Sequence, residues 1–255
     1  MRLLWAQLPR LESIVHESCL VSRRMWKATY DRELASAIED SLPSHVRTLS
    51  FFEDLDDNLA SVLPHDKPIP NINTSRNASL TLVEAVSSRS RGLERLSISY
   101  LIDAQQFFSA CQSTYTWHRL RSLILTASIL TQTALGEEIY TFLQNVGLVA
   151  SNMPELEIII LWNGRRGEAC AVIYYRSRGS RLAALTWRGT FDLDFSPEVV
   201  EAWRKVASEP SNLLVKNERI QGPIESHGDA IQRLCLPDGV IGPVSLWQIQ
   251  QECMK

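Results

Sequence analysis

The sequence predicts an α/β fold: an open, curved array with a mostly parallel sheet inside and helices on its outer face. A six-residue pattern, apolar-x-x-apolar-x-apolar, recurs along the chain, and stretches of helical period separate its copies. The copies begin at positions 46, 93, 120, 156, 182 and 231, which leaves gaps of 47, 27, 36, 26 and 49 residues. Leucine-rich repeats run ~20–29 residues, so the short gaps fit one repeat and the long gaps fit two. We therefore expect an irregular, leucine-rich-repeat-like array.

Each copy of the pattern is expected to form a short buried strand. The clearest copy is 156–161, where apolar residues occupy both faces, as parallel strands covered on both sides require. Leu8–Val15 shares the proline-led start of Met153–Ile160, so another strand is expected at the beginning of the chain. A weaker copy at 213–215 divides the last gap.

Helices are expected between these strands, because apolar residues return there at intervals of three and four. Two helix starts are indicated by pairs that resemble capping boxes, Thr81 with Glu84 and Asp103 with Gln106. A third helix start is indicated by a serine before Pro197. Further helical segments carry apolar stripes at Trp26, Tyr30, Leu34 and Ile38, at 139–150, and after Pro243.

Two features break the regular alternation. Gly164–Gly167 predicts a turn that joins strand 156–162 to strand 169–175, and residues 176–181 predict a second turn that leads to strand 182–188. Together they predict a local antiparallel meander. The stretch Pro64–Ala78 is rich in proline, asparagine and serine and is expected to be an exposed loop within a single domain, 1–255.

Composition excludes several classes of function. The net charge of −3 and the pI of about 6.0 argue against nucleic acid as a partner. The five cysteines form no CxxC pair, so neither a zinc site nor a disulfide framework is indicated. No apolar run is long enough for a secretory signal or a membrane span, so no membrane contact is expected. We expect an intracellular protein, cytoplasmic or nuclear, without a cofactor.

Several segments resemble one known family. They are Leu156–Ala171, Leu185–Asp194, Ser226–Leu236, Ser245–Gln250, and the stretches 51–55 and 117–123. The family consists of large filamentous-fungal proteins of F-box type, whose C-terminal part is a domain of unknown function. The resemblance runs from about Leu8 onward. It implies an N-terminal F-box that docks the Skp adaptor of an SCF ubiquitin ligase, and repeats that recruit a target protein.

This sequence departs from the family plan at its start. An F-box needs ~40–50 residues of helical hairpin upstream, and a repeat-like strand is already expected here by Leu11. We therefore expect the repeat part alone, shortened at its N-terminus. A Skp-type adaptor is expected as a partner only if an F-box precedes this sequence. The target protein is unknown.

Three polar clusters suggest chemistry, and each has a structural alternative. Ser226, His227 and Asp229 contain the residue types of a hydrolase triad, but neighbouring side chains on one backbone rarely face each other, so a polar helix start is favoured. Asp192 and Asp194 alternate with apolar residues, as in a half-buried strand. The acidic run 53–57 lacks the pattern of a calcium loop. No catalytic, cofactor-binding or metal-binding residues are assigned.

The best candidate for a binding surface lies around the meander. If its two turns lie at one end of the sheet, their arginines form a basic patch beside two strand-ending tryptophans. Arginine and tryptophan anchor many protein interfaces. Core packing of the tryptophans and solvated turn arginines are the favoured alternatives. The residues assigned to protein binding are Trp162, Arg165, Arg166, Trp187 and Arg188.

The function expected from these observations is that of a non-catalytic protein-binding scaffold, with target recognition for an F-box-type ubiquitin-ligase adaptor as its finer form. Two alternatives stay open. One is a hydrolase that uses His227. The other is an uncharacterised fungal protein that keeps the fold without an adaptor function.

Overall fold

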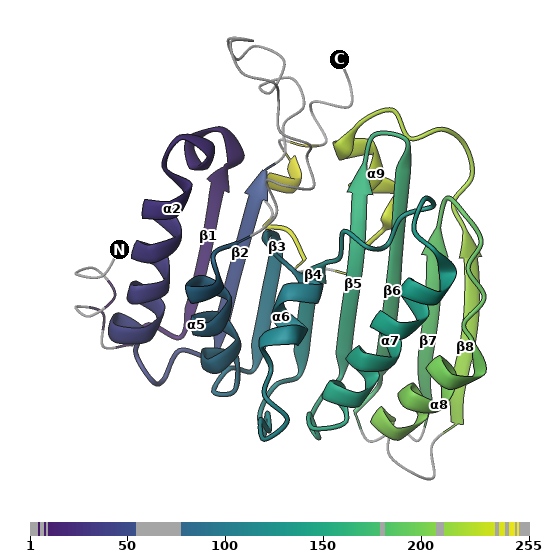
Figure 1. Cartoon of the computed structure of the whole chain (residues 1–255), viewed down its shortest axis with the longest axis horizontal. Helices are drawn as coiled ribbons and strands as arrows, with labels where there is room; N and C mark the ends of the chain where they lie inside the picture. The colour runs from purple at the N-terminus through teal and green to yellow at the C-terminus, as the bar shows by residue number, and fades with distance from the viewer. Residues whose placement is uncertain are drawn as a thin grey trace.

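One open sheet of eight strands organises the molecule (Figure 1). The computed structural model describes Trp5, Leu8, and residues 10–54, 78–178, 182–207, 212–237, 240–242, 245–247 and 249. The strands lie side by side in chain order. They are β1 (Ser13–Cys19), β2 (Thr48–Asp54), β3 (Arg95–Asp103), β4 (Ser122–Thr126), β5 (Ile158–Arg165), β6 (Glu168–Arg176), β7 (Leu182–Gly189) and β8 (Asn212–Arg219).

The strand directions confirm the predicted sheet. Strands β1 to β5 are parallel, and β8 is parallel to β7. Between them, β5, β6 and β7 form an antiparallel meander with turns where the glycine-rich and arginine-rich segments were expected. The expected loop at 64–78 lies outside the described residues except for Ala78, and so does Pro243.

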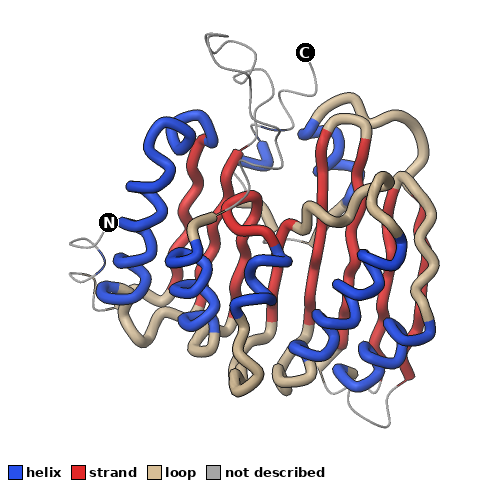
Figure 2. The backbone as a smooth tube through the Cα atoms, in the orientation of Figure 1, coloured by secondary structure: helices blue, strands red, loops and turns tan. Residues whose placement is uncertain are grey.

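Most helices cover one side of the sheet, which we call the helix face (Figures 1 and 2). Each of these helices lies in a connection between two neighbouring parallel strands, and successive connections run in the same direction across the sheet. Such connections are right-handed, so all of these helices lie on the same side. These helices are α2 (Leu20–Ser36), the π-helix η1 (Ala37–Ser41), α5 (Leu80–Ser90), α6 (Ala104–Ala110), α7 (Gly136–Ala150) and α8 (Pro197–Val206).

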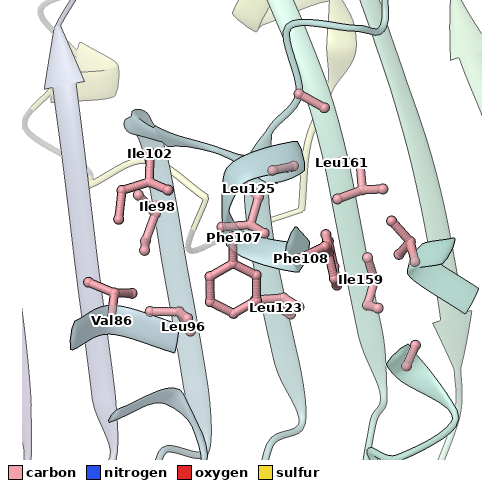
Figure 3. Close-up of a cluster of buried hydrophobic side chains, with 14 of the residues drawn as sticks. Val86, Leu96, Ile98, Ile102, Phe107, Phe108, Leu123, Leu125, Ile159 and Leu161 are labelled. Carbon is pink, nitrogen blue, oxygen red and sulfur yellow. The ribbon is translucent and has the colours of Figure 1, made fainter. Parts of the chain in front are cut away.

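The main core lies between the sheet and these helices. Alternate residues of the central strands point into it, including Leu96, Leu123 and Ile159, and they pack against Phe107 and Phe108 of α6 (Figure 3). The six-residue pattern predicted these strand residues correctly, because side chains two positions apart share a face of a strand. The local helix start differs from the prediction at α5, where the side chain of Ser79 caps the helix by accepting from the Leu82 amide.

The opposite side of the sheet, the second face, is also partly covered, and here two expectations were wrong. Residues 231–236 were expected to form a strand, but His227–Leu234 is a helix, α9, that packs on β5 and β6. Helices therefore lie on both faces. Ile231 and Leu234 are three residues apart, a spacing that fits one side of a helix as well as a strand pattern.

A second core forms beneath α9. It contains Phe52, Tyr100, Ile124, Ile160 and Trp162 from the sheet and Ile231 and Leu234 from α9. A further strand expectation was wrong in the helix-face core, where residues 191–195 form a loop. Phe191 and Leu193 are buried there and alternate with exposed aspartates, as the pattern predicted.

Candidate functional site

A groove of about 930 Å³ lies between α6 and α7. Phe108, Ile129, Phe142, Leu148 and Val149 contribute apolar surface to it. Leu148 is 55% exposed, although most apolar residues of α7 are buried. Among the described residues that line the groove, the only charged side chains are those of Glu137 and Glu138 in the first turn of α7. The groove therefore combines an apolar wall with negative charge.

The groove exists because α6 is short. It has seven residues, whereas α7 has fifteen, so α7 extends beyond its neighbour. Asp103 fixes the start of α6 by accepting from the Gln105 amide at 2.8 Å, and its other carboxylate oxygen accepts from the Ser128 amide at 2.7 Å. The helix ends at Cys111, whose backbone is extended. Burial raises the pKa of the Cys111 thiol to about 12, so this thiol stays protonated at neutral pH.

A charged network holds the loop that leads from β4 to α7. Arg165 and Glu168 form an ion pair across the first turn of the meander, at 2.7 Å. Both side chains also bond the Thr131 hydroxyl, and Glu168 accepts from the Gln132 amide. Arg165 is thus committed to positioning this loop, which contributes Ile129 and Ala134 to the groove.

The five residues assigned to a binding patch do not form one. Because β5, β6 and β7 alternate in direction, their two connecting turns lie at opposite ends of the sheet, so the premise of a shared end was wrong. Trp162 is fully buried in the second-face core, with its ring centroid 5.1 Å from that of Tyr100. Trp187 is 1% exposed in the helix-face core and donates to the carbonyl oxygen of Phe191.

The arginines of the assigned set lie towards one end of the meander but have separate roles. Arg188 anchors the end of α9, since its guanidinium donates to the carbonyl oxygens of Leu234 and Cys235 and to the carboxylate of Glu218. Arg166 is exposed in the turn between β5 and β6. Core packing therefore accounts for both tryptophans, and local pairing accounts for Arg165 and Arg188.

The residues Ser226, His227 and Asp229 form the start of α9. The Ser226 hydroxyl accepts from the Asp229 amide at 3.0 Å, which is an N-cap. The Asp229 carboxylate accepts from the Glu225 amide and from Arg233. His227 Nδ1 lies 3.2 Å from the Gly164 carbonyl oxygen. The Asp229 carboxylate is therefore engaged with the Glu225 amide and Arg233, whereas in a catalytic triad the carboxylate orients the histidine.

Sequence reasoning missed Tyr100, which joins three elements. Its φ is +65°, a left-handed conformation uncommon for residues with a side chain, and it lies where the register of β3 and β4 shifts. Its ring consequently joins the second-face core, whereas Ile98 of the same strand faces the helices. Its hydroxyl donates to the Gly164 carbonyl oxygen at 3.0 Å, and its ring centroid lies 5.0 Å from that of His227.

Sequence reasoning also missed the groove, although one signal was present. Leu148 falls outside the apolar stripe of α7, so an isolated helix would expose it.

Among the described residues, no three histidine, cysteine, aspartate or glutamate side chains come close enough to hold a metal ion. None of the described helices is both long and apolar enough to cross a membrane.

Comparison with known proteins identifies a family without a described function. No curated protein and no solved structure matches this chain. A family model described as "Family of unknown function (DUF6546)" matches residues 41–242, which span β2 to β8 and α9. The match covers most of the chain and includes both walls of the α6–α7 groove, and the chain therefore belongs to this family of unknown function.

Proposed function

We propose that the protein is a non-catalytic scaffold that binds a helical segment of another protein in the groove between α6 and α7. The observation that carries this proposal is the groove itself, with its apolar wall and two glutamates. Grooves that bind amphipathic helices present an apolar floor to residues spaced three and four apart. The fifteen residues of α7 give a wall about 22 Å long, which matches a partner helix of about four turns.

The charge of the groove defines the partner further. Glu137 and Glu138 are exposed at the N-terminal end of α7, and no lysine or arginine of the described part of the chain lines the groove to neutralise them. A partner helix with apolar residues on one side and lysine or arginine at one end would complement this surface. The engagement of Ser226 and Asp229 in a helix cap supports the non-catalytic part of the proposal.

The finer form of the proposal is that this partner is a target of an F-box-type ubiquitin ligase. The resemblance of several segments to F-box-type proteins supports it, and so does the spacing of the six-residue pattern, which favours a leucine-rich-repeat-like array. Under this proposal, the abundance of the bound protein depends on an intact groove.

Site-specific photo-crosslinking tests the groove. A photoreactive residue at Leu148 in the groove is compared with one at Leu214, which is equally exposed, at 54%, but lies on β8. We expect a discrete crosslinked protein at Leu148 only, with its linked segment predicted to be a basic amphipathic helix. The double charge reversal Glu137→Lys and Glu138→Lys is expected to weaken that crosslink about tenfold. Identical products at both positions would overturn the proposal.

The ligase role is tested on the crosslinked protein. Its half-life and ubiquitylation are measured in cells that carry either the natural chain or the charge-reversed chain. We expect the crosslinked partner protein to have a longer half-life in cells that carry the charge-reversed chain. An unchanged half-life, together with a lost crosslink, would leave the scaffold proposal standing and refute the ligase role.

A further inference from the structure

A second cavity, on the opposite side of the sheet, has the composition of a small-molecule site. After α9 the chain crosses the second face towards β1, and a space of about 610 Å³ lies between this C-terminal segment and strands β1 to β4. We use "C-terminal segment" for the described residues from His227 to Ile249. Protein sites for small molecules have volumes of roughly 300–1,000 Å³, a mostly apolar lining and a few polar groups.

The two ends of the C-terminal segment are tied to the sheet, which keeps the cavity open beneath it. Arg188 holds the carbonyl oxygens of Leu234 and Cys235 at one end. At the other end, the Ser97 hydroxyl donates to the Val240 carbonyl oxygen, and Ser245 bonds the carboxylate of Glu17. A Cβ atom added at Gly242 would meet that same carboxylate, so the segment passes close to Glu17 at this point.

The inner part of the cavity is apolar. The C-terminal segment contributes Ile231, Leu236, Val240, Ile241 and Leu246, and the sheet contributes the side chains of Val15 and Ile124. Val15 is 61% exposed although it lies in a strand. An aliphatic chain placed here would remove such surface from water, at a gain that scales with the apolar area covered.

The mouth of the cavity is polar and positively charged. Arg95 is the only charged side chain among the described residues that line the cavity. It is exposed and has no ion-pair partner among the residues that the structure describes. Thr48 and Ser122 are its direct partners on the two neighbouring strands, and Ser50 and Ser97 pair with each other in the next row. One guanidinium and four hydroxyls therefore share one face.

We propose that this cavity binds a small amphipathic carboxylate of the long-chain fatty-acid type. Its aliphatic chain lies between the second face and the C-terminal segment, and its carboxylate binds Arg95. A guanidinium binds a carboxylate through two parallel hydrogen bonds, and the hydroxyls of Thr48 and Ser122 beside Arg95 can donate to the remaining lone pairs. The inference is separate from the protein-binding groove, which lies on the other side of the sheet and shares no lining residue with this cavity.

Fluorescence titration of the full-length, delipidated protein with a dansyl-labelled long-chain fatty acid tests the proposal. We expect saturable binding that dodecanoic acid competes away. Arg95→Glu is expected to weaken binding at least about tenfold, because it replaces the attractive charge with a repulsive one. Arg119→Glu is the matched control, since Arg119 is also exposed but lies outside the cavity, and it should leave binding unchanged.

A second variant tests where the aliphatic part of the fatty acid binds, and two further competitors test the requirement for its carboxylate. Ser50→Phe fills the cavity while Arg95 stays in place, and it should abolish binding without lowering Tm. Dodecanol, which lacks the charge, and dodecyl phosphate, which carries a different one, are each expected to compete at least about tenfold more weakly than dodecanoic acid. Equal competition by dodecanol, better competition by dodecyl phosphate, or unchanged binding to Arg95→Glu would each overturn the proposal.

Discussion

The start of α9 shows how one side chain decides a local structure. The Ser226 hydroxyl accepts from the Asp229 amide, which is an open donor of the first helical turn, and the Asp229 carboxylate accepts from the Glu225 amide just before the cap. By residue type alone, Ser226, His227 and Asp229 resemble the catalytic triad of a hydrolase. Their hydrogen bonds instead explain why the chain turns into a helix at this point.

Replacing the capping serine tests this interpretation. Ser226→Ala removes the acceptor of the Asp229 amide and is expected to lower the free energy of unfolding by about 1 kcal/mol. Urea denaturation measures the loss. Ser226→Asp keeps an acceptor at the N-cap and should retain most of the stability. An equal loss in both variants would show that the hydroxyl has a role other than capping.

His16 provides a second residue-scale prediction, on pH. Burial lowers the pKa of His16, against a smaller opposing effect of the neighbouring Glu17 carboxylate, and the ring bonds the Tyr30 hydroxyl at 2.7 Å. The unfolded chain binds the proton more readily, with a pKa of about 6.5. The contribution of His16 to stability is therefore complete above this value and is lost as the pH falls through the lower folded pKa.

Unfolding measured between about pH 7.5 and pH 4.5 checks the sign of this effect. His16→Gln cannot titrate and should flatten part of the decline in stability, whereas the exposed His118→Gln should leave the decline unchanged. A decline that is the same in His16→Gln and in the natural protein would assign the pH dependence to other groups.

At the scale of elements, helix α7 packs closely on α8 through a glycine. A Cβ atom added at Gly147 would lie 3.0 Å from the Cβ of Ala202 and 3.3 Å from its backbone carbon. Gly147→Val should therefore push the two helices apart and destabilise the protein by about 1–3 kcal/mol, as overpacking does. Gly136→Ala is the control in the same helix, since its Cβ would meet only Tyr140, at 3.6 Å.

Thermal unfolding compares the two glycine variants. We expect a lower Tm for Gly147→Val and an equal or higher Tm for Gly136→Ala, because alanine favours a helix more than glycine does. If Gly147→Val unfolds like the natural protein, the α7–α8 contact is looser than its atomic distances indicate.

The same scale shows what the sequence could and could not predict. Strands β2 to β7 and the meander were predictable, because buried strands and glycine turns depend on residues close together in the chain. Helix α9 was mistaken for a strand, because apolar residues at positions 1 and 4 of the pattern also share one side of a helix. The Ser226 cap favours the helix locally, and the contact with β5 and β6, which is distant in sequence, supports it.

The candidate sites were less predictable than the fold, for the same physical reason. The groove depends on the difference in length between α6 and α7, and the expected arginine patch depended on which end of the sheet each turn occupies. Arg95 is one exposed arginine among many in the sequence. Its position among four hydroxyls appears only once the strands are in register.

At the scale of the whole molecule, the sheet separates two cores of unequal size. The helix-face core is covered by α2, α5, α6, α7 and α8, whereas the second-face core has a single regular helix of eight residues above it among the described elements. Parts of a protein with fewer buried contacts open at a lower free energy than the main core. We therefore expect α9 to separate from the sheet before the helix face unfolds.

Gly164→Val tests this order of opening, because a Cβ at Gly164 would lie 3.2 Å from Ala230 of α9 and 3.3 Å from the Trp162 ring. Hydrogen exchange followed by mass spectrometry should show faster exchange in His227–Leu234, with exchange in α7 unchanged. Gly92→Ala is the control, since its Cβ would make only ordinary contacts, at 3.8 Å and beyond. Equal acceleration in α7 and α9 would mean that both cores open together, and the sheet would then unite the two layers into one cooperative unit.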